Sequence, residues 1–126
     1  MGACALMSSA TPSPFERDYC VYLEDMLEFS GSVIEYTAGH TFETWAADAM
    51  RLDATLRKLS LIGEAATKVP AAIRDQAPDI PWRQIVGARN RLMHVYPSTD
   101  LSAIWSIVSI NVPVLRPALQ APLSRL

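Results

Sequence analysis

The chain has 126 residues, of which half are hydrophobic and 19% are charged, and its formal net charge is −2. This length fits one small domain with a packed core, which excludes a disordered or low-complexity protein. The slightly acidic balance argues against a protein that coats nucleic acid through overall positive charge. Two cysteines, Cys4 and Cys20, are too few for a disulfide scaffold, and we expect both to be thiols.

The first 14 residues are rich in Ala, Ser, Thr and Pro and contain no basic residue. We expect them to form a flexible leader rather than a signal peptide, with Met7 as an alternative start. No uninterrupted apolar run approaches the length of a membrane span. The sequence therefore predicts a cytoplasmic protein with no membrane association, a bundle domain over 15–120 and a tail over 121–126.

Five helices are expected in chain order, and each has a recognisable boundary. Ser13 and Pro14 start the first helix, Thr41 caps the second, Pro70 ends the second, and Asp100 is a cap for the fifth. The expected helices cover residues 15–37, 41–69, 71–76, 82–94 and 101 onward, with a kink of the last at Pro113.

Apolar residues recur at steps of three and four along the expected helices, most regularly from Trp45 to Ala66. A stripe of this kind is typical of a long helix packed along another. No segment alternates with period two, so no sheet is expected. The predicted fold class is all-α, an antiparallel four-helix bundle with an extra short helix.

Most common catalytic patterns are absent from the sequence. There is no glycine-rich phosphate loop, and two distant histidines with two distant cysteines do not favour a zinc site. We expect no metal and no cofactor. The charge distribution is more informative, because residues 80–99 contain three arginines, one histidine and no acid, while the rest of the chain carries eight basic and thirteen acidic residues. A basic segment on an acidic protein indicates a local anion site; the alternative is a solvated helix face.

Within this segment, Arg89 and Asn90 are followed by His94 and Tyr96. A guanidinium binds phosphate with a planar fork, and an imidazole exchanges protons near neutral pH, so these two groups suffice in type for metal-free phosphodiester cleavage. On a helix Asn90 and His94 share a face, whereas Arg89 and His94 are rotated by about 140°. Arg89 and His94 would then meet across a two-fold axis or where the helix frays before Pro97.

The pattern Arg89-Asn90-x3-His94-x-Tyr96 resembles the RNxxxHxY motif of the HEPN superfamily, and the chain is most similar to its HepT-like toxins. The resemblance covers about residues 17–119 and includes segments 36–39, 62–66, 78–82 and 86–90. The sequence departs from the family at Pro97, directly after the motif tyrosine.

The resemblance implies a dimeric helical bundle in which two motifs form one composite, metal-independent endoribonuclease site. It assigns phosphate stabilisation to Arg89, acid–base chemistry to His94 and an orienting role to Asn90. It implies a toxin–antitoxin pair with RNA as substrate, in which a partner minimal nucleotidyltransferase silences the toxin by transferring AMP to Tyr96. Glu64 lies one step off the apolar stripe, and we expect it to border the site or the dimer interface. Arg91 is also expected to border the site.

Each of these assignments has a structural alternative. His94 could cap the end of its helix, Tyr96 could be a packing residue, and Arg89 could pair with an acid across the bundle. For the whole protein the alternatives are a non-catalytic HEPN module that binds a nucleotide or a partner protein, and a plain helical dimerisation domain. The sequence alone does not separate the enzyme from the binding module.

Overall fold

The computed structural model describes the backbone of residues 14–95 and 100–125, and the side chains of residues 19–92 and 100–120. All of the regular structure in these ranges is helical, as the sequence predicts. The elements are α2 (Pro14–Thr37), α3 (Phe42–Ala47), α4 (Ala49–Thr67), α5 (Ala71–Asp75), α6 (Trp82–Val95), α7 (Leu101–Ser106), η2 (Ile107–Asn111) and α8 (Val112–Arg125).

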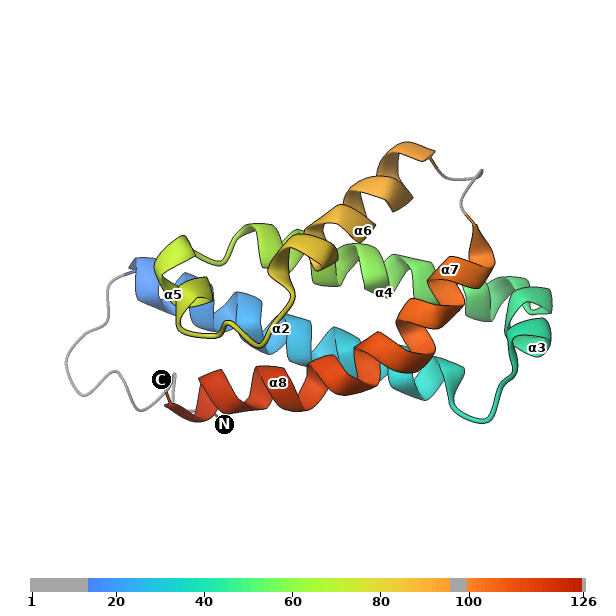
Figure 1. The fold of residues 1–126 in the computed structure, drawn as a ribbon, viewed down its shortest axis with the longest axis horizontal. Helices are drawn as coiled ribbons and strands as arrows, with labels where there is room; N and C mark the ends of the chain where they lie inside the picture. The colour runs from blue at the N-terminus through green and yellow to red at the C-terminus, as the bar shows by residue number, and fades with distance from the viewer. Residues whose placement is uncertain (1–13, 96–99, 126) are drawn as a thin grey trace.

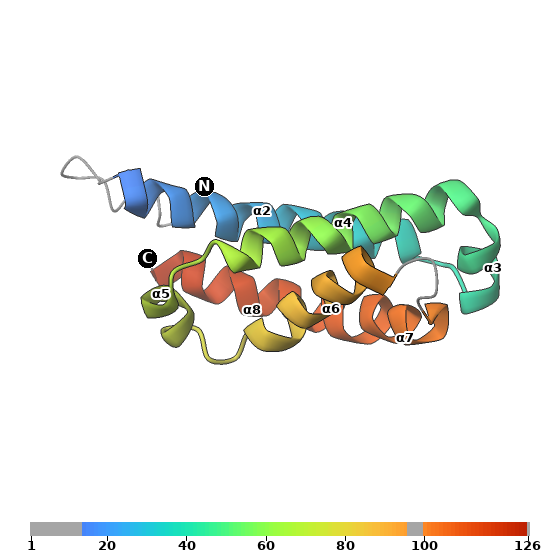
Figure 2. The same ribbon diagram turned by 90° about the horizontal axis from the view of Figure 1, so that it is seen from above.

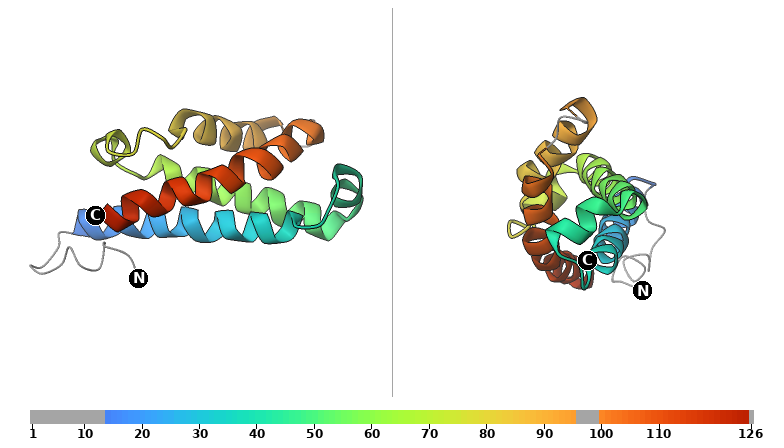
Figure 3. Two further views of the ribbon diagram at one scale, coloured as in Figure 1. Left: turned by 60° about the horizontal axis from the view of Figure 1, so that its bottom comes forward. Right: turned by 90° about the vertical axis from the view of Figure 1, so that its right-hand side faces the viewer.

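The long segments of the bundle are α2, α4, α6 and the continuous stretch α7–η2–α8, and each runs antiparallel to its neighbours (Figure 1). The first helix, α2, lies between α4 and α8 and contacts both, while α6 packs on α4. Turning the molecule shows α2 and α4 together on one side and the segment α7–η2–α8 on the other (Figures 2 and 3). The prediction of an all-α antiparallel bundle is therefore confirmed.

The core lies between α2, α4 and α8. Its fully buried side chains recur at helical spacing, so they lie on the helix faces that point toward the bundle axis. They include Leu23, Met26, Val33, Ala66, Val108 and Leu119. Burial of these apolar surfaces supplies the main stabilisation of a bundle, at roughly 25 cal/mol for each Å² removed from water.

The stretch from Thr41 to Pro70 is two helices, not the one that the apolar stripe predicted. Asp48 adopts an extended conformation (φ −97°, ψ 96°), and its carboxylate accepts a hydrogen bond from the backbone N–H of Arg51 at 3.1 Å. An aspartate at this position caps a new helix, so α3 ends and α4 begins with a change of direction. Trp45 of the short helix is fully buried and donates its indole N–H to the hydroxyl of Thr55 at 3.2 Å.

Two helix caps have carboxylates whose acidity is altered by their hydrogen bonds. The backbone hydrogen bond from Arg51 lowers the pKa of Asp48, and the hydroxyl of Ser102 lowers the pKa of Asp100. In α2, partial burial raises the pKa of Asp25, with Glu28 adding to the shift. Asp100 begins α7, as the sequence predicted.

The last long segment changes helical pitch before Pro113. The backbone N–H of Val112 bonds to the carbonyl of Ile107, five residues earlier, which makes η2 a π-helical turn. Proline has no N–H to donate, and a π-turn is one way in which a helix accommodates that loss. The irregularity expected at Pro113 therefore takes the form of η2.

Residues Leu101–Gln120 form a helical stretch whose mean hydropathy of 1.3 and length would allow it to cross a membrane, and 22% of it is buried. Inspection of uninterrupted apolar runs missed this stretch because serines, an asparagine and prolines divide it. Length and composition alone are weak evidence for a span. One side of the stretch packs into the bundle, and on the other Ile110 and Val114 are 64% and 68% exposed.

The expectation of a free thiol is wrong for Cys20. Cys20 is buried in α2 and is disulfide-bonded, while Cys4 lies outside the described residues. The low cysteine count argues against a fold held together by several disulfides, but it does not exclude one disulfide bond.

Candidate functional site

The helices α4 and α6 lie in close contact where Gly63 faces Arg89. A Cβ atom placed on Gly63 would overlap the Cβ and Cγ atoms of Arg89. Gly63 is buried, and its missing side chain allows the backbone of α4 to lie against the base of the arginine. This contact sets the position along α4 at which α6, the helix that carries Arg89 and Asn90, packs against it.

The guanidinium of Arg89 is held by two neighbours. Its Nη2 lies 2.6 Å from Oε2 of Glu64, and its Nη1 donates to Oδ1 of Asn90 at 3.0 Å. The Nε atom is buried and has no hydrogen-bond partner among the residues that the structure describes. The side chain as a whole is 22% exposed. Arg89 is thus fixed in position by Glu64 and Asn90, and its side chain is partly exposed to solvent.

Glu64 lies between two cations. Its Oε1 is 3.8 Å from Nζ of Lys68, one helical turn further along α4, and Oε2 faces Arg89. The Glu64 and Lys68 side chains are 45% and 50% exposed, so water screens the longer pair strongly. The short contact to Arg89 is a charge-assisted hydrogen bond, which is stronger and more directional. Glu64 therefore orients the guanidinium.

The other residues of the predicted site lie along α6. Asn90 is exposed and adjoins Arg89, and Arg91 is exposed on the same helix. Position 94 lies one helical turn beyond Asn90, close to the end of α6 at Val95. The side chain of His94 and the whole of Tyr96 lie outside the described residues, so the structure does not place the imidazole or the phenol.

The structure brings together Arg89, Asn90 and Glu64, which the sequence placed in or beside the site. The sequence also allowed a purely structural role for Arg89, pairing with an acid across the bundle, and the ion pair with Glu64 is a contact of that kind. The two descriptions are compatible, because a phosphate-binding arginine must be oriented by some neighbour.

Sequence reasoning did not identify Lys68, or the tight contact at Gly63. Signals for both were present in the sequence. Lys68 follows Glu64 by four residues, a spacing that favours an ion pair on a helix. Gly63 lies on the apolar stripe of α4, where a glycine often marks a close helix approach.

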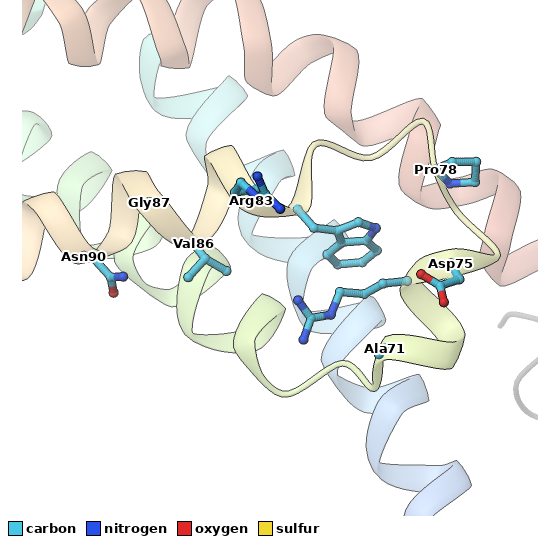
Figure 4. A pocket seen from close by; sticks show the side chains of 9 residues that line it. Ala71, Asp75, Pro78, Arg83, Val86, Gly87 and Asn90 are labelled. Atoms are coloured by element: carbon cyan, nitrogen blue, oxygen red, sulfur yellow. The ribbon is translucent and has the colours of Figure 1, made fainter.

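A pocket of about 740 Å³ opens beside Asn90. It lies between α5, the connector that follows α5, and the first half of α6 (Figure 4). The nine lining residues are Ala71, Arg74, Asp75, Pro78, Trp82, Arg83, Val86, Gly87 and Asn90. Asn90 therefore both lines the pocket and contacts the guanidinium of Arg89.

The family model for HepT-like ribonucleases matches residues 26–122, which include all of the elements just described except the start of α2 and the end of α8. The chain belongs to the HepT-like family. Among curated relatives, "Putative RNase MJ1380" of Methanocaldococcus jannaschii is 35% identical over 80% of this chain and 93% of its own length. "Probable ribonuclease HepT" of Thermococcus cleftensis is 33% identical over 80% of this chain and 92% of its own length. No solved structure matches the chain.

Family membership confirms the resemblance that residues 89–96 and the segments around them indicated. It covers the bundle from Met26 and so includes both halves of the Gly63–Arg89 contact. The roles of single residues rest on the geometry above and are not settled by membership.

Replacing Gly63 by alanine is expected to destabilise the protein by about 1–3 kcal/mol, because the new methyl group must displace Arg89 or push α4 and α6 apart. Urea denaturation followed by circular dichroism measures the change. Gly87 is the matched control, since a Cβ on this α6 residue meets nothing within 4 Å. Gly87→Ala should be neutral or more stable by up to about 1 kcal/mol. Equal stability of Gly63→Ala and the parent would contradict the close contact.

Proposed function

We propose that this protein is a metal-independent endoribonuclease and the toxin of a cytoplasmic toxin–antitoxin pair. Its RNA-cleaving site would combine Arg89, Asn90 and His94 from two copies of the chain. A partner nucleotidyltransferase would silence it by transferring AMP to Tyr96. The observation that carries this proposal is the guanidinium of Arg89, oriented by Glu64 and Asn90 on a helix that bears no acid.

The reaction requires a phosphate contact and proton transfers. The 2′-oxygen of a ribose attacks the adjacent phosphorus, the bond to the 5′-oxygen breaks, and a 2′,3′-cyclic phosphate forms. The fork of Arg89 stabilises the charge that develops on the phosphorane oxygens. His94 of one copy takes the 2′-hydroxyl proton and His94 of the other gives a proton to the leaving 5′-oxygen.

Pairing of two copies is supported by two observations. On one helix Arg89 and His94 are rotated by about 140° from each other, so a second copy is the simplest source of a histidine that faces the arginine. Exposed apolar side chains suited to an interface occur on α2 (Val21) and on the C-terminal segment (Ile110 and Val114). A two-fold interface would cover the same patch on both copies.

A non-catalytic binding module is the second candidate, and the Arg89–Glu64 ion pair favours it to some degree. A carboxylate at 2.6 Å competes with a phosphate for the same Nη2 donor. In the enzyme, the phosphate would take the N–H donors of Nη1 and Nη2 that Asn90 and Glu64 leave unused, while Glu64 keeps the guanidinium in place. The two candidates therefore differ in whether bound RNA is cut.

The deciding experiment incubates the full chain with end-labelled single-stranded RNA in excess EDTA. We expect cleavage products that end in a 2′,3′-cyclic phosphate, and no cleavage of an oligonucleotide with the same sequence but 2′-deoxyribose at every position. Light scattering of the same sample should report a dimer or a larger species. Binding without cleavage would favour the module, and cleavage by a strictly monomeric species would contradict the composite site.

A further inference from the structure

The pocket beside Asn90 has the size and the lining of a ligand site. Its volume of about 740 Å³ lies within the range of roughly 300–1,000 Å³ that is usual for small-molecule pockets. Its lining combines two guanidinium groups, an indole and an amide with small apolar residues, and Asp75 is the one acid among the nine. This composition suits an anion that also carries a flat ring.

The two arginines of the pocket have donors to spare. Arg74 uses Nε to donate to the carbonyl of Val69 at 3.0 Å, which fixes the side chain. Among the described residues its two terminal amino groups have no hydrogen-bond or ion-pair partner, so they are available to a ligand. Arg83 is exposed on α6 and makes no ion pair within the part of the chain that the structure describes. Arginine forks match the geometry of phosphate oxygens.

The aromatic side chain is also fixed in place. Trp82 donates its indole N–H to the carbonyl of Ala77 at 3.1 Å, so the ring cannot rotate freely. It is partly buried against the core and also lines the pocket. Protein sites for unpaired nucleotides stack bases on such rings and on guanidinium planes.

The register of α6 connects the pocket with the proposed catalytic residues. Arg83, Asn90 and position 94 are separated by seven and four residues, which places them within about 20° of one face of the helix. Along the helix axis, position 90 is about 10 Å from position 83 and about 6 Å from position 94. A single strand that follows this face would pass from the pocket to position 94 by way of Asn90.

We propose that this pocket binds one nucleotide of the RNA strand, next to the nucleotide that is cut. Arg74 and Arg83 bind its phosphate, and Trp82 stacks on its base. The inference rests on the proposed ribonuclease function and adds a binding subsite to it. The subsite holds the strand along the face of α6 that carries Asn90, whose side-chain oxygen accepts a hydrogen bond from the guanidinium of Arg89.

The test measures binding separately from cleavage. The probe is a fluorescein-labelled single-stranded RNA with 2′-O-methyl groups at every position, which lacks the attacking hydroxyl and cannot be cut. Fluorescence anisotropy with the full-length chain gives the affinity as a function of salt. Arg83→Ala should weaken binding about five- to tenfold and reduce the slope of log affinity against log salt by about 0.7, the value for one phosphate contact on a single strand.

Two further variants test the stacking contact and control for charge. Trp82→Leu should weaken binding about tenfold or more with no change in salt slope, while Trp82→Phe should keep most of the affinity. Arg116→Ala is the charge-matched control, because Arg116 is exposed on α8, lies against Gly31 and does not line the pocket. Its affinity should equal that of the parent.

Three outcomes would overturn the subsite. They are an unchanged affinity of Arg83→Ala, an equal loss in Arg116→Ala, or tight binding of free AMP by a chain that does not bind the RNA probe. The Arg83→Ala result stands even if Trp82→Leu fails to fold, because Arg83 is exposed. A parent that binds the probe through Arg83 but does not cut unmodified RNA would retain the subsite and reject the ribonuclease.

Discussion

Replacement of His94 by alanine is expected to lower RNA cleavage by at least about a hundredfold, the usual loss when a positioned acid–base group is removed. Position 94 lies in the last turn of α6, beyond the contact between Gly63 and Arg89. The helical circular dichroism should therefore stay the same. The measurement is the initial rate of cleavage of an end-labelled RNA by matched amounts of folded protein.

Arg89→Lys should show a similar loss, of about a hundred- to a thousandfold, for a different reason. Lysine keeps the positive charge beside Glu64 but cannot offer two parallel donors to a phosphate. It also retains Cβ and Cγ atoms, so the packing against Gly63 persists. Arg116→Ala, which removes a cation from α8, is the control and should cut at the parental rate.

The two variants also separate the candidate functions. If His94→Ala cut RNA as fast as the parent, histidine catalysis would be rejected and the binding module would become the better description. If Arg89→Lys alone kept full activity, the charge of Arg89 would matter and its fork would not.

Tyr96→Phe is expected to abolish labelling by the partner enzyme. The proposed reaction joins the phenol oxygen of Tyr96 to the α-phosphorus of ATP and releases pyrophosphate. The phenol is neutral at pH 7, because its ordinary pKa is near 10, and so the partner must supply a base. Intact-mass spectrometry after incubation with ATP and the proposed partner nucleotidyltransferase should show added AMP on the parent and none on the variant.

The same experiment tests the consequence for catalysis. An added adenylate brings a negative charge close to Arg89 and His94 in sequence and competes with RNA phosphate for their donors. The labelled parent should therefore lose cleavage and keep its helical circular dichroism. Tyr22→Phe is a suitable control, since Tyr22 lies on α2 with its ring 5.7 Å from Nζ of Lys68. Equal labelling of Tyr96→Phe and the parent would place the acceptor on another residue.

Much of the fold could be predicted because helix boundaries are encoded locally. Thr41, Pro70 and Asp100 each mark a boundary through their own backbone or side-chain chemistry, and the structure has helix ends at all three. Asp48 carries the same kind of signal. The regular apolar stripe runs across Asp48, however, and predicts one continuous helix there. A capping residue can end one helix and begin the next while the apolar residues keep the same spacing in the sequence. The spacing alone therefore does not reveal the break.

The site was less predictable because it depends on the distance between helices. Arg89 and Glu64 are 25 residues apart, and only the crossing of α4 and α6 brings their side chains to 2.6 Å. Glu64 was placed near the site because it lies one step off the apolar stripe, and that position does not identify its partner. The pocket beside Asn90 requires α5 and the connector after it to fold back on α6, which no periodicity reports.

Gly63 and Glu64 are adjacent, yet they are constrained by different properties of Arg89. Glycine is needed at position 63 because any Cβ there would overlap the Cβ of residue 89, an atom that every amino acid except glycine has. The glutamate is required by the guanidinium, since its other contact, with Lys68, is long and screened by water. A descendant that lost its nuclease activity, and with it the arginine, would still need glycine at position 63 but would be free to replace the acid at position 64. Divergence at these two neighbouring positions would then distinguish relatives that keep the bundle from relatives that keep the chemistry.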